Sequence, residues 1–320
     1  MMKKFLKKLF LFALPLMVLS IPLDIMLSNY LKKSNNYNGE MEVMNDIYSG
    51  KASCDIAIMG SSRAWVHFNP EIIEKAVNQS VYNFGHDGHN FWLQYMRNLE
   101  YNKYNKAPKT IIQSVDVFTI QKRKNLYLYE QFLPYMLWNS NMAKYTSTYE
   151  GYDFFDYYIP LVRYCGEKEV LKEAYSYWKG TKNPNDKTRT KGYAGRDKKW
   201  NSDLKKATVK KEKYTISIDK PSEELLEKFI IECNKNNIKL ILVYTPEYID
   251  GQKFVKDRNK VIDVYKKLSK KYAIPFWDYS SDSISFNKDY FYNANHLNKT
   301  GSNLFTTKFA ERFKKEITTK

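Results

Sequence analysis

The stretch IAIMGSSRAWVHFNP, residues 56–70, places two serines directly after a short apolar run. The run predicts a buried strand ending at Gly60, so Ser61 and Ser62 fall where a strand passes into a helix. Backbone N–H groups converge at such a turn, and a helix N-terminus stabilises negative charge. A serine there can attack a carbonyl carbon if a histidine takes its proton and backbone amides bind the oxyanion. The alternative is a simple N-cap, a position at which serine is preferred.

The candidate bases are four histidines: His67, His86, His89 and His296. His296 lies in YFYNANHLNKTGSNLF, a polar stretch predicted to be the loop between the last strand and the last helix. Loops that follow parallel strands share one edge of the sheet, so His296 can approach Ser62. Solvent exposure is the alternative for a single loop histidine. His86 and His89 lack a third ligand at metal-binding spacing, which favours a supporting or surface role and no metal site.

The elements that must position these residues follow from hydrophobic periodicity. Short apolar runs alternate with helical stretches, which predicts an α/β fold: a three-layer α/β/α sandwich with a parallel sheet. Its ligand site should lie at the carboxyl ends of the strands. Asn69 followed by Pro70 predicts a helix start, and Ser222 is expected to cap a later helix. The predicted strands are CDIAIMG, SVYNFG, TIIQSVDVF, IKLILVYTP and IPFWDYS, and the predicted helices cover 69–78, 90–104, 221–237, 253–272 and 300–317.

The first 33 residues predict a membrane anchor. A basic stub, MMKKFLKK, precedes an uncharged apolar run from Leu9 to Leu23, and flanking apolar residues extend it to the roughly 20 residues of a transmembrane helix. A signal peptide is the alternative, but no A-x-A-like cleavage site follows, which favours an uncleaved anchor. Four lysines precede the run and only Lys32 and Lys33 directly follow it. The positive-inside rule therefore places the N-terminus in the cytoplasm and the main domain outside the cell membrane.

Composition and charge narrow the partners. The 320 residues are 43% hydrophobic and 27% charged, as in globular proteins. The formal net charge of +17 favours anionic partners such as lipid headgroups, acidic polymers or nucleic acid, and an extracytoplasmic location excludes nucleic acid. Three cysteines, Cys54, Cys165 and Cys233, show no metal or redox spacing, although one disulfide is allowed outside the membrane.

Four segments are expected: a stub and anchor (1–33), a tether (34–53), a catalytic-type domain (54–316), and within it an insertion (119–219). The insertion is rich in tyrosine and then basic, because residues 179–213 hold 13 Lys/Arg and 4 Asp/Glu. Long insertions between core elements commonly form lids, partner surfaces or loops over an active site. The basic part is either a solvated loop or, with the tyrosines, a groove for carbohydrate or an anionic polymer.

Together these stretches resemble the SGNH/GDSL hydrolase superfamily over residues 54–118 and 222–316. MGSSR stands at the Gly-Asp-Ser block, with Ser61 at the aspartate position and Ser62 at that of the nucleophile. YNFGHDG resembles the second block, which implies an oxyanion hole made by the N–H groups of Ser62 and of Gly85 or Gly88. NANHLNKTG resembles the Asp-x-x-His block, which implies His296 as the base. The resemblance is closest to membrane-anchored members that act beside O-acyltransferases on cell-surface polymers, as in D-alanyl transfer to teichoic acid.

Two departures from the family pattern affect the chemistry. Asn293 replaces the acid of the last block, and an Asp→Asn change in a Ser-His-Asp triad costs about 10⁴ in rate. Three outcomes are open: a dyad oriented by a backbone carbonyl, a substitute acid, or an inactive scaffold. The oxyanion donor of the third block has no clear match, and Arg63 could hold an anionic substrate group or form a structural ion pair. Candidates for the substitute acid are Asp278, Asp282 and Asp289, with Asp278 also expected to cap a turn; candidates for the donor are Gln113, Ser114 and Asp116.

The resemblance implies an extracytoplasmic serine esterase or O-acyltransferase that acts on acyl esters of a cell-surface polysaccharide or related polymer. No cofactor is expected. The expected partners are the polymer, the membrane and a membrane-bound O-acyltransferase. The alternative function is a catalytically inactive accessory protein that binds such a polymer or such an acyltransferase.

Overall fold

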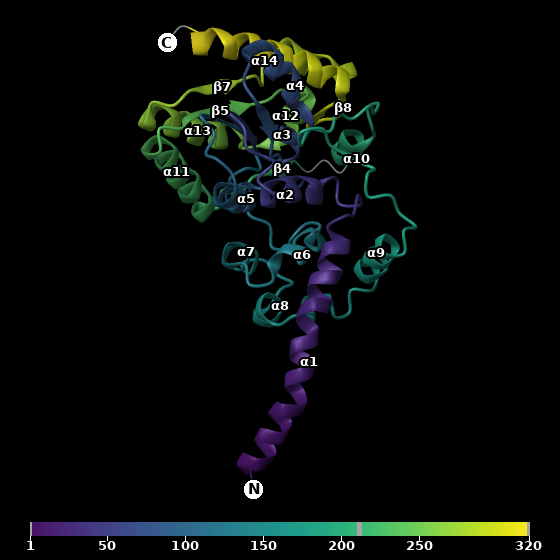
Figure 1. Ribbon diagram of the computed structural model, residues 1–320. Coiled ribbons are helices and arrows are strands. Elements are labelled where there is room, and N and C mark those ends of the chain that lie inside the picture. The colour runs from purple at the N-terminus through teal and green to yellow at the C-terminus, as the bar shows by residue number, and fades with distance from the viewer. Residues whose placement is uncertain (1, 210–212, 319–320) are drawn as a thin grey trace. The chain divides into compact units, whose positions relative to one another are not determined.

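The computed structural model describes residues 2–209 and 213–318. The chain forms two compact units (Figure 1). The first unit combines residues 1–45 with 123–188, and the second combines residues 46–122 with 189–320. The predicted insertion at 119–219 is therefore divided, since its last part belongs to the unit that holds the sheet.

The second unit is built on a five-stranded sheet in which all neighbouring strands are parallel. The strand order β2-β1-β3-β5-β7 is the 2-1-3-4-5 order of flavodoxin-like doubly wound folds. The predicted α/β fold class is thus confirmed. The strands are β1 (Ile56–Met59), β2 (Val81–Asn83), β3 (Thr110–Val115), β5 (Lys239–Tyr244) and β7 (Phe276–Asp278).

Helices cover both faces of this sheet (Figure 1). One face carries α3 (Ser62–His67), α4 (Pro70–Val77) and α14 (Lys299–Thr318), and the other carries α5 (Phe91–Tyr104), α11 (Lys220–Lys235) and α13 (Arg258–Tyr272). Two small sheets lie outside the main one, β4 (Tyr214–Thr215) with β6 (Val255–Lys256), and β8 (Phe291–Asn293) with β9 (His296–Leu297). Short helices complete the unit: α10 (Asp203–Val209), α12 (Ile249–Phe254), η3 (Ser283–Phe286) and η4 (Lys288–Tyr290).

Alternate residues of the strands supply the core on the α14 side. Ile56 and Ile58 of β1 pack with Ile112 of β3 and with the rings of Phe305 and Phe309 on α14. Burial on both faces explains why the strands read as continuous apolar runs. This core holds α3, and with it the serines, against the carboxyl ends of the strands.

Helix caps decide where two of these helices begin. Asn69 caps α4 and Pro70 occupies its first turn, as predicted. The prediction of Ser222 as a cap is wrong, because Asp219 caps α11 and accepts hydrogen bonds from the N–H and hydroxyl of Ser222. Pro221 belongs in the first turn of the helix, so the cap must precede it.

The first unit is helical and rich in buried tyrosine. It contains α1 (Met2–Leu31), η1 (Tyr129–Gln131), α6 (Leu133–Met136), α7 (Ser140–Thr146), α8 (Phe154–Tyr158), η2 (Val162–Tyr164) and α9 (Lys168–Trp178). Helix α1 is long and apolar enough to cross a membrane. The segment predicted as a tether contains helix α2 (Glu40–Tyr48), whose Met41, Val43 and Ile47 side chains are buried. The division between the two units falls within α2.

Candidate active site

The turn after β1 separates the roles of the two serines. Gly60 has φ +148°, and a Cβ there would lie 2.8 Å from the Cβ atoms of Ala64 and Ser114, so only glycine fits. Ser61 is the N-cap of α3, where its Oγ accepts the N–H of Arg63 and donates to the carboxylate of Asp116 at 2.6 Å. Ser62 is the first residue of the helix, which leaves its hydroxyl free to face another element.

That element is the β8–β9 hairpin, which carries His296. The Oγ of Ser62 lies 2.7 Å from Nε2 of His296, and Nδ1 of His296 lies 2.9 Å from Oδ1 of Asn293. The three side chains thus form a continuous hydrogen-bonded array at the carboxyl edge of the sheet. This is the geometry required of a nucleophile, its base and the group that orients the base.

The amide orientation of Asn293 determines the tautomer of His296. Oδ1 of Asn293 also accepts the backbone N–H of Asn295 at 3.0 Å, so this atom is an acceptor. The Nδ1 atom of His296 must then carry the ring proton and donate it to Oδ1. Nε2 is left with its lone pair and accepts the hydroxyl proton of Ser62, as a general base requires.

The electrostatic surroundings keep this base neutral. Burial, together with the positive charge of Arg63, lowers the pKa of His296 to about 3. The imidazole is therefore unprotonated at neutral pH. The ring of Tyr292 stacks against it with 5.4 Å between centroids and 7° between planes, which fixes the plane of the imidazole.

A second histidine, His67, holds the hairpin in place. Its Nε2 accepts the backbone N–H of Leu297 at 3.0 Å, and its Nδ1–H donates to the hydroxyl of Thr245 at 2.7 Å. Burial and the nearby Arg63 lower the pKa of His67 well below its usual range, so it too is neutral. In the sequence, His67 is only one of four histidines. The apolar residues around it in AWVHF, residues 64–68, are the sequence pattern that could have predicted its burial.

Arg63 is not placed to bind an anionic substrate. The side chain is 2% exposed, and its donors go to the carboxylate of Glu247 at 3.0 Å, the hydroxyl of Thr245 at 3.1 Å and the carbonyls of Thr245 and Pro246. Of the two predicted alternatives, the structural ion pair is the one that the structure contains. The reason is that Arg63 lies on the buried side of α3, whereas Ser62 faces the hairpin.

The two glycines proposed for the oxyanion hole differ in availability. The N–H of Gly85 donates to Oδ1 of Asn83 at 2.9 Å, and a Cβ at Gly85 would lie 2.3 Å from the backbone N of Trp65. Gly85 therefore serves close packing against α3, and its N–H is already engaged with Asn83 in this conformation. Gly88 has φ +71° and lies in the turn closed by the N–H of His89 to the carbonyl of His86. The N–H groups of Ser62 and Gly88 remain as the candidate donors.

None of the third-block candidates is placed as an oxyanion donor. The amide of Gln113 donates to Gln94 and to the carbonyl of Ser114. The carboxylate of Asp116 accepts from Ser61, from the N–H of Phe118 and from Thr119. Ser114 is fully buried beside Gly60, and within the described residues its hydroxyl has no partner.

The predicted substitute acids bond elsewhere. Asp278 accepts the N–H of Ser280, so its predicted turn-capping role is confirmed. Asp282 caps η3 and pairs with Lys308. No hydrogen bond joins Asp278, Asp282 or Asp289 to His296 among the described residues, and Asn293 is the residue that orients the base.

The other histidines and the cysteines form neither a metal site nor a disulfide among the described residues. The rings of His86 and His89 lie 4.1 Å apart, and both side chains are buried. Within the described ranges, 2–209 and 213–318, no group of three or more His, Cys, Asp or Glu could hold a metal ion. Cys54, Cys165 and Cys233 are free cysteines, so the disulfide that the sequence allowed is not formed.

Comparisons with models of protein families and with curated proteins give no match for this chain. Several solved structures resemble it weakly, among them the following three. A protein from Streptococcus pneumonia, provisionally described as a platelet activating factor, is 13% identical with a TM-score of 0.44, covering 93% of this chain and 99% of its own. A protein from Desulfitobacterium hafniense, provisionally described as a lipolytic protein of the G-D-S-L family, is 9% identical with a TM-score of 0.37, covering 80% and 97%. A provisionally described acylhydrolase from Bacteroides fragilis is 12% identical with a TM-score of 0.32, covering 81% and 87%. These TM-scores are below 0.5, too low to assign a role to any residue of this chain.

Proposed function

We propose that this chain is a membrane-anchored serine esterase or O-acyltransferase of the SGNH type, which acts on acyl esters of a cell-surface polysaccharide or related polymer. The observation that carries the proposal is the 2.7 Å contact between Oγ of Ser62 and Nε2 of His296. The bond from Nδ1 of His296 to Asn293 supports it, because it leaves Nε2 as the proton acceptor.

The array supports a two-step acyl transfer. Oγ of Ser62 attacks the ester carbonyl carbon while its proton passes to Nε2 of His296. The tetrahedral intermediate then expels the alcohol, which takes the proton from His296, and the acyl group remains on Ser62. Water, or a hydroxyl group of the polymer, attacks the acyl-serine with His296 again acting as base, and the free serine is restored. Attack by water gives an esterase, and attack by a polymer hydroxyl gives an acyltransferase.

Asn293 and the backbone stabilise the charges that develop. The imidazolium formed during attack donates through Nδ1 to the amide oxygen of Asn293. This oxygen is neutral, so it stabilises the imidazolium less than a carboxylate does. The oxyanion accepts the N–H of Ser62, at the N-terminus of α3, and the N–H of Gly88.

The basic segment supports an anionic polymer as the substrate. Among residues 189–209, which belong to the same unit as Ser62, Lys198, Lys199, Lys205 and Lys206 are exposed. Arg196 lies with its guanidinium 4.6 Å from the ring centroid of Trp65, three residues after the nucleophile. Positive charge near a site raises the local concentration of anionic substrate.

The packing of α1 supports an uncleaved anchor. Asp24 of α1 is 2% exposed and accepts hydrogen bonds from both terminal nitrogens of Arg163 at 2.7 Å. It also accepts the N–H of Leu161, and Ser28 of the same helix contacts Tyr164. Removal of α1 as a signal peptide would leave Arg163 buried without its carboxylate, at a cost of about 3–5 kcal/mol. Helix α1 is therefore a structural part of the first unit.

Labelling with a serine-directed fluorophosphonate tests the proposal. We expect the full-length protein to be labelled and Ser62→Ala to lose all labelling. Ser61→Ala is the matched control, because it removes a cap worth about 1 kcal/mol but keeps the nucleophile, so it should still be labelled. Absence of labelling in a folded wild-type protein would contradict the enzyme and favour the alternative, an inactive accessory protein.

A further inference from the structure

The first unit carries an exposed aromatic patch formed by Trp138 and by the α8 segment. Phe154 is 66% exposed, Phe155 57% and Trp138 57%, and Tyr158 and Ile159 are exposed as well. We propose that this aromatic patch lies in the interfacial layer of the outer leaflet of the bilayer, beside α1. The proposal rests on α1 spanning the membrane, which is part of the proposed function.

The local structure of α8 holds the residues of the patch in place. Within α8 the carboxylates of Asp153 and Asp156 form a capping box with backbone N–H groups, so they are engaged with the helix itself. Tyr157 points inward, where its hydroxyl contacts that of Thr146. The outward residues contact one another, since the rings of Phe154 and Tyr158 are 4.6 Å apart.

Trp138 belongs to the same surface. Its indole Nε1–H donates to the carbonyl of Tyr158 at 3.0 Å, and its backbone N–H donates to the carbonyl of Tyr157. The ring is thus held against the end of α8 with one face exposed. Aromatic rings with a polar handle are typical of membrane–water interfaces.

Hydrogen bonds fix the level of the patch along α1. The chain leaves the patch at Ile159, and two residues later the N–H of Leu161 bonds to Asp24 at 2.7 Å. The uncharged apolar run of α1 begins at Leu9, directly after Lys7 and Lys8, and ends at Leu23, directly before Asp24. The patch therefore lies where the apolar part of α1 ends.

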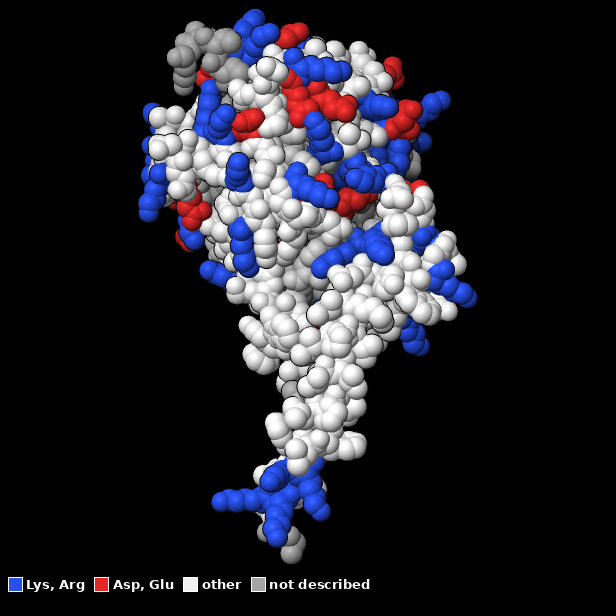
Figure 2. Space-filling view, viewed as in Figure 1, with Lys and Arg blue, Asp and Glu red and all other residues white. Residues whose placement is uncertain are grey.

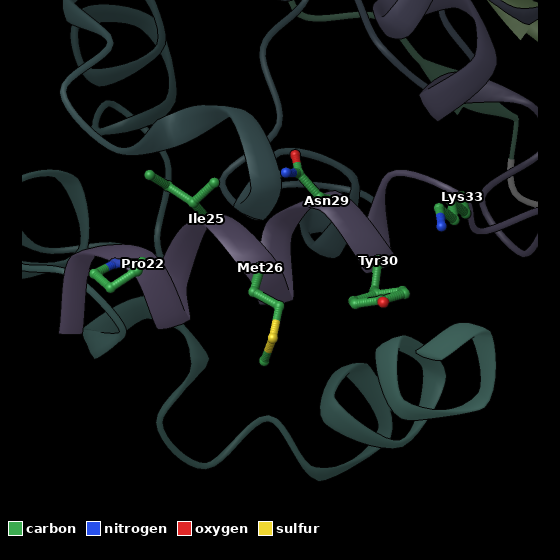
Figure 3. Close-up of a pocket in the computed structure, with 6 residues that line it drawn as sticks. All are labelled: Pro22, Ile25, Met26, Asn29, Tyr30 and Lys33. Carbon is green, nitrogen blue, oxygen red and sulfur yellow. The ribbon is translucent and has the colours of Figure 1, made fainter. Parts of the chain in front are cut away.

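The surface of α1 changes polarity at the same level. A shallow groove along the helix is lined by Pro22, Ile25 and Met26 at one end and by Asn29, Tyr30 and Lys33 at the other (Figure 3). This change from apolar to polar side chains marks a membrane–water boundary near residues 26–29.

The distribution of charge agrees with this placement. Along α1, the face shown in Figure 2 is almost free of Lys, Arg, Asp and Glu from the basic N-terminal stub to the level of the first unit's helices. The five residues of the patch carry no charge. Exposure of such an aromatic surface to water is unfavourable, and its transfer from water to a lipid interface is favourable.

Spin-label accessibility in phospholipid vesicles tests the proposal with the full-length chain. Cys165 is exposed, whereas burial raises the pKa of the thiols of Cys54 and Cys233 to about 12, so Cys165→Ser is a sufficient background for labelling. Nitroxides are placed by Phe155→Cys in the patch and by Leu16→Cys within α1. The matched control is Tyr175→Cys, an exposed aromatic of α9, because α9 contacts Ser34, ten residues beyond Asp24.

We expect the label at Phe155 to collide more with oxygen, and several-fold less with a water-soluble nickel complex, than the label at Tyr175. Phe154→Cys serves as a second position if Phe155→Cys does not fold. The proposal is overturned if the labels at Phe155 and Tyr175 are equally accessible to nickel while that at Leu16 is in lipid. In that case the patch would be a binding surface for a protein partner, since the vesicles contain no other protein that could cover it. If the label at Leu16 is itself accessible to nickel, α1 does not span the membrane. The membrane-anchor part of the proposed function would then be wrong, while the proposed esterase chemistry would be unaffected.

Discussion

Two polar networks include residues of α3, and they differ in whether their side chains are charged. The first, Ser62 with His296 and Asn293, contains no formal charge. The second lies on the buried side of the same helix, where the carboxylate of Glu247 contacts two guanidinium groups, Arg63 at 3.0 Å and Arg258 at 2.8 Å. Sequence neighbours, Ser62 and Arg63, therefore belong to networks of different kinds.

The difference shows how a serine–histidine pair can work without an aspartate. Loss of rate after an Asp→Asn change in a triad is attributed to the wrong histidine tautomer. Here the N–H of Asn295 fixes the amide of Asn293, so the tautomer is the productive one. The amide contributes orientation, while the charged network contributes stability and lowers the pKa of the base through Arg63.

The largest expected effect is the loss of the base. His296→Ala should lower kcat/KM for an activated ester by about 10²–10⁴-fold, the usual contribution of a general base. The thermal midpoint should change little, since the His296 side chain is only partly buried and its ring nitrogens bond to the two other members of the array. Steady-state kinetics on the purified full-length protein measures the effect. Unchanged kcat/KM would show that the 2.7 Å contact with Ser62 has no catalytic role.

Breaking the charged network should affect stability. Glu247→Gln leaves Arg63 and Arg258 without a carboxylate and should cost about 3–5 kcal/mol in the free energy of unfolding. Asp263→Asn is the matched control, because its pair with Lys266 is solvent-exposed and such pairs contribute about 0–1 kcal/mol. Urea denaturation measures both. Equal losses in the two variants would contradict the structural role assigned to Arg63.

Introducing charge into the neutral network should accelerate the reaction. Asn293→Asp keeps both acceptor contacts and adds a negative charge that stabilises the imidazolium, so we expect kcat/KM to rise about ten-fold. The acid limb of the pH profile should move up by about one to three pH units. Asn293→Leu, similar in shape but without an acceptor, should lower kcat/KM. A slower aspartate variant, or an unaffected leucine variant, would contradict the orienting role of Asn293.

The smallest expected effect is that of mild acid on the wild-type rate. Because the pKa of His296 is lowered to about 3, the base stays neutral and kcat/KM should be nearly constant from pH 7 to pH 5. Stability should fall over the same range. The pKa values of His67 and His296 are lowered in the folded state, so below about pH 6.5 the unfolded state binds protons that the native state does not. A fall in kcat/KM with a midpoint near 6.5, in protein that is still folded, would contradict this account.

Much of the fold was predictable because it depends on local patterns. Five apolar runs became the five strands of the parallel sheet, and the helices between them follow from residue spacing and from caps such as Asn69 with Pro70. The start of α11 was misjudged, since both Asp219 and Ser222 are good caps and only the position of Pro221 distinguishes them. The first unit was not predicted as a unit, because it joins segments that lie more than 75 residues apart in the chain.

For the site, the sequence by itself determined that Ser62 and His296 could meet, because parallel strands bring the loops at their carboxyl ends to one edge. Only the tertiary structure decided the rest. Whether Arg63 faces solvent or Glu247, and whether the N–H of Gly85 is free or bonded to Asn83, depends on side chains from distant segments. The Gly-Ser-Ser turn thus contains a cap, Ser61, and a candidate nucleophile, Ser62. The physical reason is that adjacent residues at a helix start point in different directions, and the packing of α3 selects what each one contacts.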